Sequence, residues 1–177
     1  MATSTVVPLV RTWTRVLLAV MLMALGIWVF LVPLAGPYFS FGFDTATRWR
    51  FSQVHWITSL APGMALFGGG VLLLSRRRLV EELGAFAALA AGVWLEVAPS
   101  LHGVWSSTAF IPQPAGAWHT AWLWIGYFYG PGALAIYLAA RAQALRHRSQ
   151  ASGSPTMQQS RPNASSRPRE DVPTPVY

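Results

Sequence analysis

Four long apolar blocks constrain this 177-residue chain more than any other feature. They cover about residues 16–35, 51–74, 79–98 and 114–140. The hydrocarbon core of a bilayer is about 30 Å thick, and about 20 helical residues, at about 1.5 Å each, are enough to cross it. Each block is long enough for one transmembrane helix. The sequence therefore predicts an all-α, polytopic membrane protein with four spans.

The composition excludes several classes of protein. Charged residues make up 11% of the chain, whereas about 25% is typical of soluble domains. The chain has no cysteine, which excludes disulfides and thiolate metal sites. It has no lysine for a phosphate-binding loop and no Ser/His/Asp arrangement within one element, so we expect no enzyme. The net charge of +7 comes from arginines between the apolar blocks, and we expect membrane lipid, not nucleic acid, as a partner.

The arginines also predict the orientation of the chain. Positive residues collect on the cytoplasmic side of membrane proteins. Eight arginines adjoin the blocks on one side and two on the other: Arg11, Arg15, Arg76, Arg77, Arg78, Arg141, Arg146 and Arg148 against Arg48 and Arg50. The sequence thus predicts a multi-pass protein of the bacterial cytoplasmic (inner) membrane with both termini in the cytoplasm. Glu81 and Glu82, in the first turn of the third helix, complement its dipole.

The composition changes after the last apolar block. Residues 1–148 form the predicted four-span membrane domain. Residues 149–177 are rich in Ser, Pro, Gln and Arg and have almost no apolar periodicity. We interpret them as a cytoplasmic tail that is disordered or docked on a partner.

A short pattern occurs twice in the chain. The segment from Gly26 to Pro33 aligns without a gap with the segment from Gly92 to Pro99. Pro62-Gly63 in the second block corresponds to Pro131-Gly132 in the fourth. These matches predict a tandem duplication of a two-helix unit, with repeat one at about 16–78 and repeat two at about 79–148. The residues assigned to helix packing are Gly26, Trp28, Pro33, Pro62, Gly63, Gly92, Trp94, Pro99, Pro131 and Gly132.

The Gly-x-Trp-x-x-x-x-Pro pattern at the end of the first helix of each unit resembles the SPW-repeat membrane proteins of bacteria. The resemblance covers about residues 19–140. The family takes its name from a Ser-Pro-Trp tripeptide. The corresponding positions in this chain are Val32-Pro33-Leu34 and Ala98-Pro99-Ser100. The resemblance implies an architecture of repeated two-helix units and implies no particular activity.

The paired prolines and tryptophans have a structural interpretation. A Pro-Gly step inside a membrane helix is tolerated where a neighbouring helix satisfies the freed carbonyl. Pro33 and Pro99 are expected to end their helices, and Trp28 and Trp94 to pack against helices or lipid.

Four ionisable residues fall near the predicted outer surface. Apart from Glu81 and Glu82 in the first turn of the third helix, Glu96 is the one acidic residue within a block, and His55, His102 and His119 lie at the same side by topology. Together they are candidate ligands for a divalent metal such as Zn²⁺. His119, with His55 as a facing partner, is also a candidate axial ligand of a tetrapyrrole. A hydrogen-bonded Glu96 and aromatic packing explain the same residues more simply, so no cofactor is assigned.

These features lead to three functional hypotheses. The first is a non-catalytic accessory or assembly subunit of a larger bacterial membrane complex, respiratory or photosynthetic, with other integral membrane subunits as partners. The second is a small transporter or channel that uses the Pro-Gly-broken helices. The third is an outer-face metal- or tetrapyrrole-binding protein.

The predicted topology can be tested because the chain has no native cysteine. A cysteine at Ser106 should react with an impermeant thiol reagent in intact cells. One at Ser152 should react only after permeabilisation. The opposite pattern would contradict the orientation drawn from the arginines.

Overall fold

A computed structural model describes residues 6–39, 41, 55–105 and 116–151, with no side-chain description for 6–11, 102, 105 and 147–151. Every element in these ranges is helical, and they contain no strand. The elements are α1 (Val6–Ala35), η1 (Gly36–Phe39), η2 (Trp56–Leu60), α3 (Ala61–Leu73), α4 (Arg78–Trp105), α5 (Ala117–Trp124), η3 (Ile125–Tyr129) and α6 (Gly130–Ala151). The short segment η1 is a 3-10 helix, whereas η2 and η3 are π-helical turns.

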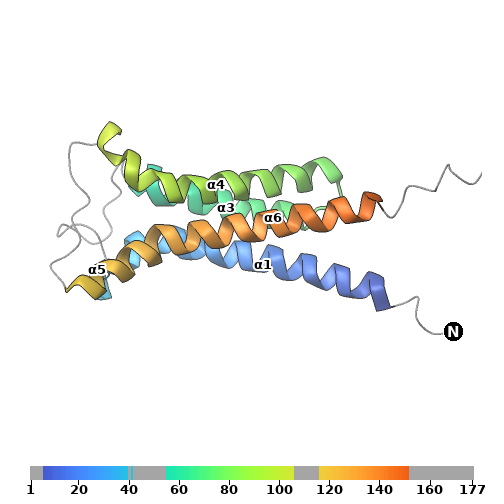
Figure 1. The fold of residues 1–177 in the computed structure, drawn as a ribbon, viewed down its shortest axis with the longest axis horizontal. Helices are drawn as coiled ribbons and strands as arrows, with labels where there is room; N and C mark the ends of the chain where they lie inside the picture. Colours follow the sequence, from blue (N-terminus) through green and yellow to red (C-terminus); the bar gives the residue numbers. More distant parts are fainter. Residues whose placement is uncertain (1–5, 40, 42–54, 106–115, 152–177) are drawn as a thin grey trace, which may run out of the picture.

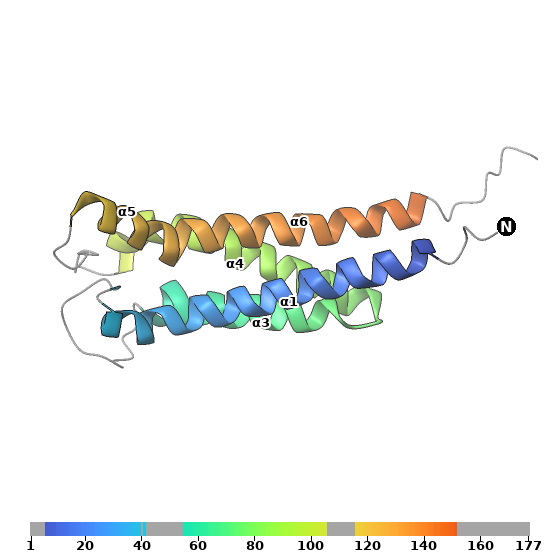
Figure 2. The same cartoon turned by 90° about the horizontal axis from the view of Figure 1, so that it is seen from below.

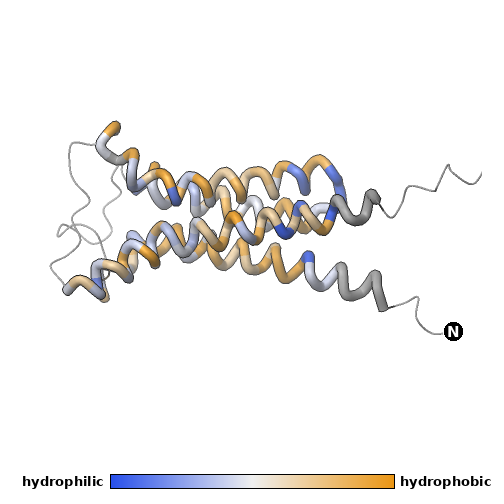
Figure 3. Tube along the Cα trace, in the orientation of Figure 1, coloured by the Kyte–Doolittle hydropathy of each residue, from blue (hydrophilic) through white to orange (hydrophobic). Residues whose placement is uncertain are grey.

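The helices form an elongated bundle in which consecutive spans run in opposite directions (Figures 1 and 2). The start of α1, the end of α3, the start of α4 and the end of α6 lie together, and we call this the terminal end. The opposite end, with η1, η2 and α5, is the loop end. In Figure 3 many hydrophilic positions lie at the terminal end and others lie in the loop-end half, while apolar positions follow the length of the helices.

Four stretches are long and apolar enough to cross a membrane: Thr12–Phe39, Trp56–Leu73, Arg78–Leu101 and Ala117–Arg146. The predicted all-α fold with four membrane-spanning helices is therefore confirmed. The tail prediction lies almost wholly outside the described residues, since α6 covers only its first three positions.

The prediction that Pro33 and Pro99 end their helices is wrong. α1 continues through Pro33 and ends at Ala35, the predicted end of the first block, and α4 continues through Pro99 to Trp105. A proline within a helix removes one backbone hydrogen bond, and membrane helices tolerate this loss. At its other end α1 begins at Val6, about ten residues before the apolar block, because hydropathy marks the hydrocarbon thickness and not the helix end.

All four spans contribute to one apolar core. Its larger side chains are at most 1% exposed, and they come from α1, α3, α4, α5, η3 and α6: Leu22, Val29, Leu66, Leu95, Leu123, Phe128 and Leu138. Small residues such as Ala85, Ala88 and Ala135 fill the remaining positions. Alanine at these positions lets the helix backbones approach closely, which is how membrane helices gain packing energy.

Glycines set the closest approaches between helices. A Cβ built on Gly26 in α1 lies 2.7 Å from the carbonyl oxygen of Gly63 in α3. A Cβ built on Gly92 in α4 lies 3.0 Å from the carbonyl oxygen of Gly132 in α6. Both separations are below ordinary contact: a Cβ at Gly26 would force the α1 and α3 backbones apart, and one at Gly92 would require its neighbours in α6 to shift slightly. Within Gly68-Gly69-Gly70, Gly69 packs on α4 and Gly70 on α1, while a Cβ on Gly68 would meet nothing within 4 Å.

This packing makes a direct prediction for two neighbouring glycines. Gly63→Ala should destabilise the bundle by about 1–3 kcal/mol, because its Cβ would lie 2.8 Å from the backbone nitrogen of Phe30. Gly68→Ala should have little effect or stabilise slightly. The stability of both variants is measured by following their unfolding as the SDS fraction of the detergent is raised. Equal losses for the two variants would contradict the assigned contact.

Candidate functional site

The residues predicted to bind a metal lie in the loop-end half of the bundle. His55 precedes η2, His119 lies on α5 and Glu96 lies on α4. Among the described side chains, no three His, Cys, Asp or Glu residues come close enough to hold a metal ion. The side chain of His102 is outside the described set, so the four-residue site stays a prediction.

The tetrapyrrole candidates have the following surroundings. The His119 ring packs edge-on against Phe41, with centroids 6.4 Å apart. His55 is partly buried at the start of η2. The facing pair of imidazoles for haem stays a prediction.

The loop-end half does contain a repeated backbone arrangement. In η2 the Ala61 amide donates to the carbonyl of Trp56, five residues back. The next amide in this register would bond the Ile57 carbonyl, but it belongs to Pro62, which has no N–H. The Ile57 carbonyl therefore has no helical donor.

The same register occurs in the last span. The Gly130 amide donates to the Ile125 carbonyl. The next position is Pro131, and the carbonyl left without a helical donor is that of Gly126. Ile57 and Gly126 are thus the second residues of their π-helical turns, each five positions before a proline.

A tryptophan from the other half of the chain supplies each missing donor. Trp94 Nε1 in α4 donates to the Ile57 carbonyl at 2.8 Å. Trp28 Nε1 in α1 donates to the Gly126 carbonyl at 2.9 Å. We call these two contacts the indole clamps. An unpaired carbonyl in an apolar medium costs several kcal/mol of free energy, and the clamps avoid this cost by giving each carbonyl a hydrogen-bond donor.

Tyr127 adds a contact beside the second clamp. Its phenol oxygen lies 3.1 Å from the Val32 carbonyl and 3.0 Å from the Phe41 carbonyl, so its one proton is shared between them. The Tyr127 ring also packs on Phe41 at 5.4 Å. The corresponding position in η2 holds the buried Thr58. The two joints therefore differ in the side chain beside the clamp.

Glu96 lies close to the Pro-Gly step of the last span. Its Oε1 is 2.7 Å from the point that a Cβ on Gly132 would occupy, so this glycine makes room for the carboxyl group. Oε1 is buried and has no hydrogen-bond partner among the described residues. Sequence reasoning singled out Glu96 correctly as a carboxyl inside a span, but not its dependence on Gly132.

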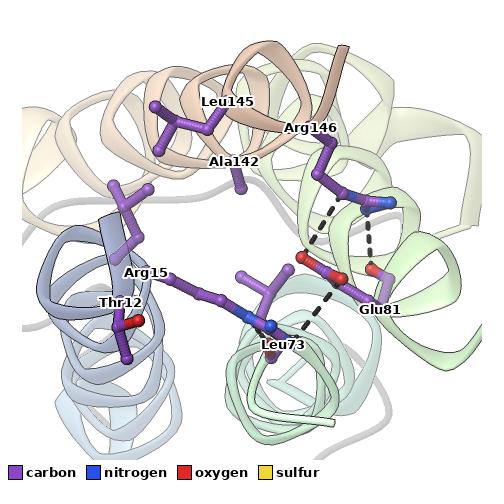
Figure 4. Close-up of a pocket in the computed structure, with 8 residues that line it drawn as sticks. Thr12, Arg15, Leu73, Glu81, Ala142, Leu145 and Arg146 are labelled. Atoms are coloured by element: carbon purple, nitrogen blue, oxygen red, sulfur yellow. Dashed lines mark hydrogen bonds and ion pairs between the residues drawn. The ribbon is translucent and has the colours of Figure 1, made fainter. Parts of the chain in front are cut away.

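A second polar cluster lies at the terminal end, where sequence reasoning expected only helix-dipole effects from Glu81. The Glu81 carboxylate lies 3.5 Å from Arg15 Nη2 in α1 and 3.6 Å from Arg146 Nε in α6. Its carbonyl accepts a hydrogen bond from Arg146 Nη2 at 3.0 Å. Figure 4 shows the two arginines reaching toward Glu81 from different helices. We call Arg15, Glu81 and Arg146 the ionic triad.

Arg15 also completes the end of α3. Its Nε donates to the Leu73 carbonyl at 2.7 Å, and its Nη2 donates to the Ser75 carbonyl. The last carbonyls of a helix lack intrahelical donors, and a cation there is favoured by the helix dipole. Arg15 and Arg146, two of the arginines that predict the orientation, thus also join four helices, α1, α3, α4 and α6.

The clamps yield a double-mutant test. Trp28→Phe should destabilise the protein by about 1–3 kcal/mol, because the Gly126 carbonyl loses its donor. Pro131→Ala restores a backbone N–H that can reach this carbonyl. In the Pro131→Ala background, Trp28→Phe should therefore cost much less. SDS-driven unfolding of the four proteins measures the coupling.

Trp122→Phe is the matched control, since this indole is 60% exposed on the surface of α5. It should lose little stability in either background. An equal cost of Trp28→Phe with and without Pro131 would show that the indole acts through packing and not through the carbonyl.

Comparison of the chain with family models, with curated proteins and with solved structures gives no match. The resemblance to SPW-repeat proteins therefore stays a prediction.

Proposed function

We propose that this protein is a non-catalytic accessory or assembly subunit of a larger bacterial membrane complex, of the respiratory or photosynthetic type. The observation that carries the proposal is the apolar core of the bundle, to which side chains from every span contribute. Apart from the ionic triad, the buried polar groups of the described residues are Thr58, Ser59, the Tyr127 phenol and Glu96 Oε1, all in the loop-end half. A substrate path across the membrane requires polar groups along its length, so this distribution supports functional contacts on the surface of the bundle.

An aromatic stripe on the last span supports a partner helix. Trp118 and Trp122 are 81% and 60% exposed, and Ile125 and Tyr129 continue the row at helical spacing. Tyr and Trp are enriched where proteins bind one another, because they bury large area at low entropic cost. We infer that another integral membrane subunit packs on this stripe.

We also propose that the two halves arose by tandem duplication. Three features recur at offsets of 66 and 69 residues: the glycine pairs, the π-helical turns and the indole clamps. Because each unit crosses twice, both copies have the same orientation, which is the parallel form of repeat. The Arg-rich terminal end supports a cytoplasmic location for both termini in a bacterial inner membrane.

A small transporter or channel is the second candidate. The observation that favours it is the π-helical turn before each Pro-Gly step, since such turns are common at functional sites and at kinks. The third candidate, a binder of metal or tetrapyrrole, depends on His55, Glu96, His102 and His119, and no described contact adds support to it.

Native gel electrophoresis after mild detergent extraction tests the leading proposal. The protein should migrate with a complex much larger than 19.4 kDa. Trp118→Ala combined with Trp122→Ala should release it to the mass of the free chain, because the docking face is lost. Phe86→Ala is the control, since Phe86 is 65% exposed on α4 outside the stripe. A single small species from native membranes would contradict the proposal and favour a free-standing transporter.

A further inference from the structure

The four spans do not all pack equally closely on their neighbours in the bundle. α1 packs closely on α3, α3 on α4 and α4 on α6, whereas α1 and α6 pack less extensively on each other. Toward the loop end Trp28 and Tyr127 join α1 to η3 of the last span. At the terminal end a cavity of about 280 Å³ lies between α1 and α6.

The walls of this cavity change from charged to apolar. Its polar side holds the ionic triad together with Thr12. Its apolar side holds Leu18 from α1 and Leu145 and Ala142 from α6. Figure 4 shows Ala142 and Leu145 on one side of the opening and Arg15 with Thr12 on the other. A single buried water needs about 15 Å³, so the space fits a group much larger than one water.

The charges of the cavity are unbalanced. Two arginines face one glutamate within the triad. The surroundings add to this excess, because Arg76, Arg77 and Arg141 are exposed at the same end. Glu82 is held by Arg78 at 3.0 Å and lies 3.9 Å from Arg146. An anion would complete the cluster, whereas a cation would be repelled.

Arg146 also has an unused donor. Its Nε is buried and has no hydrogen-bond acceptor, since Glu81 Oε1 at 3.6 Å is too distant. Buried donors are nearly always satisfied by protein, water or ligand. An oxygen-rich anion in the cavity would supply the missing acceptor, and arginine is well suited to phosphate oxygens.

We propose that this cavity is a binding site for an anionic phospholipid of the adjacent leaflet. The phosphate lies at Arg15 and Arg146, and an acyl chain leaves between α1 and α6 along Leu18 and Leu145. The site lies at the charged end of the membrane-spanning region, which is the depth of lipid headgroups. A zwitterionic lipid would place its cationic group among the surrounding arginines and should bind less well.

Thermal unfolding of the purified full-length protein in mild detergent tests the proposal. Phosphatidylglycerol should raise the melting temperature in a saturable manner, and phosphatidylcholine much less, because a ligand specific to the folded state stabilises it. Native mass spectrometry should detect one retained phosphatidylglycerol per chain. Inorganic phosphate and glycerol 3-phosphate are added separately to distinguish a lipid from a soluble phosphate.

Two variants remove the site by different means. Arg146→Gln removes a phosphate donor and should weaken lipid binding at least about tenfold, or about 1.4 kcal/mol. Because Arg146 also holds Glu81, Arg146→Gln loses an ion pair as well as a phosphate donor. Ala142→Leu is therefore the second variant: it fills the cavity and leaves the ionic triad intact. Ala142→Leu should abolish the lipid-induced shift and the retained lipid without lowering the melting temperature.

Ala140→Leu is the matched control at an exposed position of α6 and should keep the lipid response of the parent protein. An unchanged response in Ala142→Leu would overturn the proposal. An equal response to phosphatidylcholine would overturn the anionic preference, and an equal shift with glycerol 3-phosphate would replace the lipid by a soluble phosphate.

Discussion

A backbone carbonyl that faces an apolar medium must find a donor, and the loop-end half of this bundle depends on that requirement. Pro62 and Pro131 each remove the amide that would serve the carbonyl five residues earlier. The indole clamps supply the two replacements from across the bundle. In water a solvent molecule would take this role at little cost, but in hydrocarbon the donor has to be a protein group. The arrangement therefore joins each half of the chain to the other.

The glycine contacts and the clamps join different pairs of spans. Gly26 with Gly63 brings α1 close to α3, and Gly92 with Gly132 brings α4 close to α6, so the glycines hold each half of the chain together. The clamps join α1 to η3 and α4 to η2, and so connect the two halves. At the terminal end no Pro-Gly step occurs, and ion pairs centred on Glu81 join the spans instead. Hydrogen bonds to backbone carbonyls thus join the spans at the loop end, and ion pairs join them at the terminal end. The proposed lipid cavity lies beside these ion pairs.

Hydropathy predicted the four spans because the thickness of hydrocarbon sets a minimum apolar length, which is a local property of the sequence. It did not predict the helix ends, and α4 continues past Pro99 because a membrane helix tolerates one lost hydrogen bond. The Pro-Gly steps were correctly expected to need a donor from a neighbour. Their partners, Trp28 and Trp94, were assigned to packing or lipid contact, although a repeated tryptophan facing a repeated proline was a signal that an indole N–H had a fixed acceptor.

The sequence by itself determined that this is an all-α membrane protein of four spans. It also determined where the Pro-Gly steps interrupt the helical hydrogen bonds and which end of the bundle carries the positive charge. These are consequences of residue type and spacing along one chain. Only the tertiary structure decided which carbonyl each indole meets, that Glu96 lies against Gly132, and that Glu81 lies between two arginines far apart in sequence. Those contacts depend on the rotation and separation of packed helices, which arise from many side chains at once and leave no local pattern in the sequence.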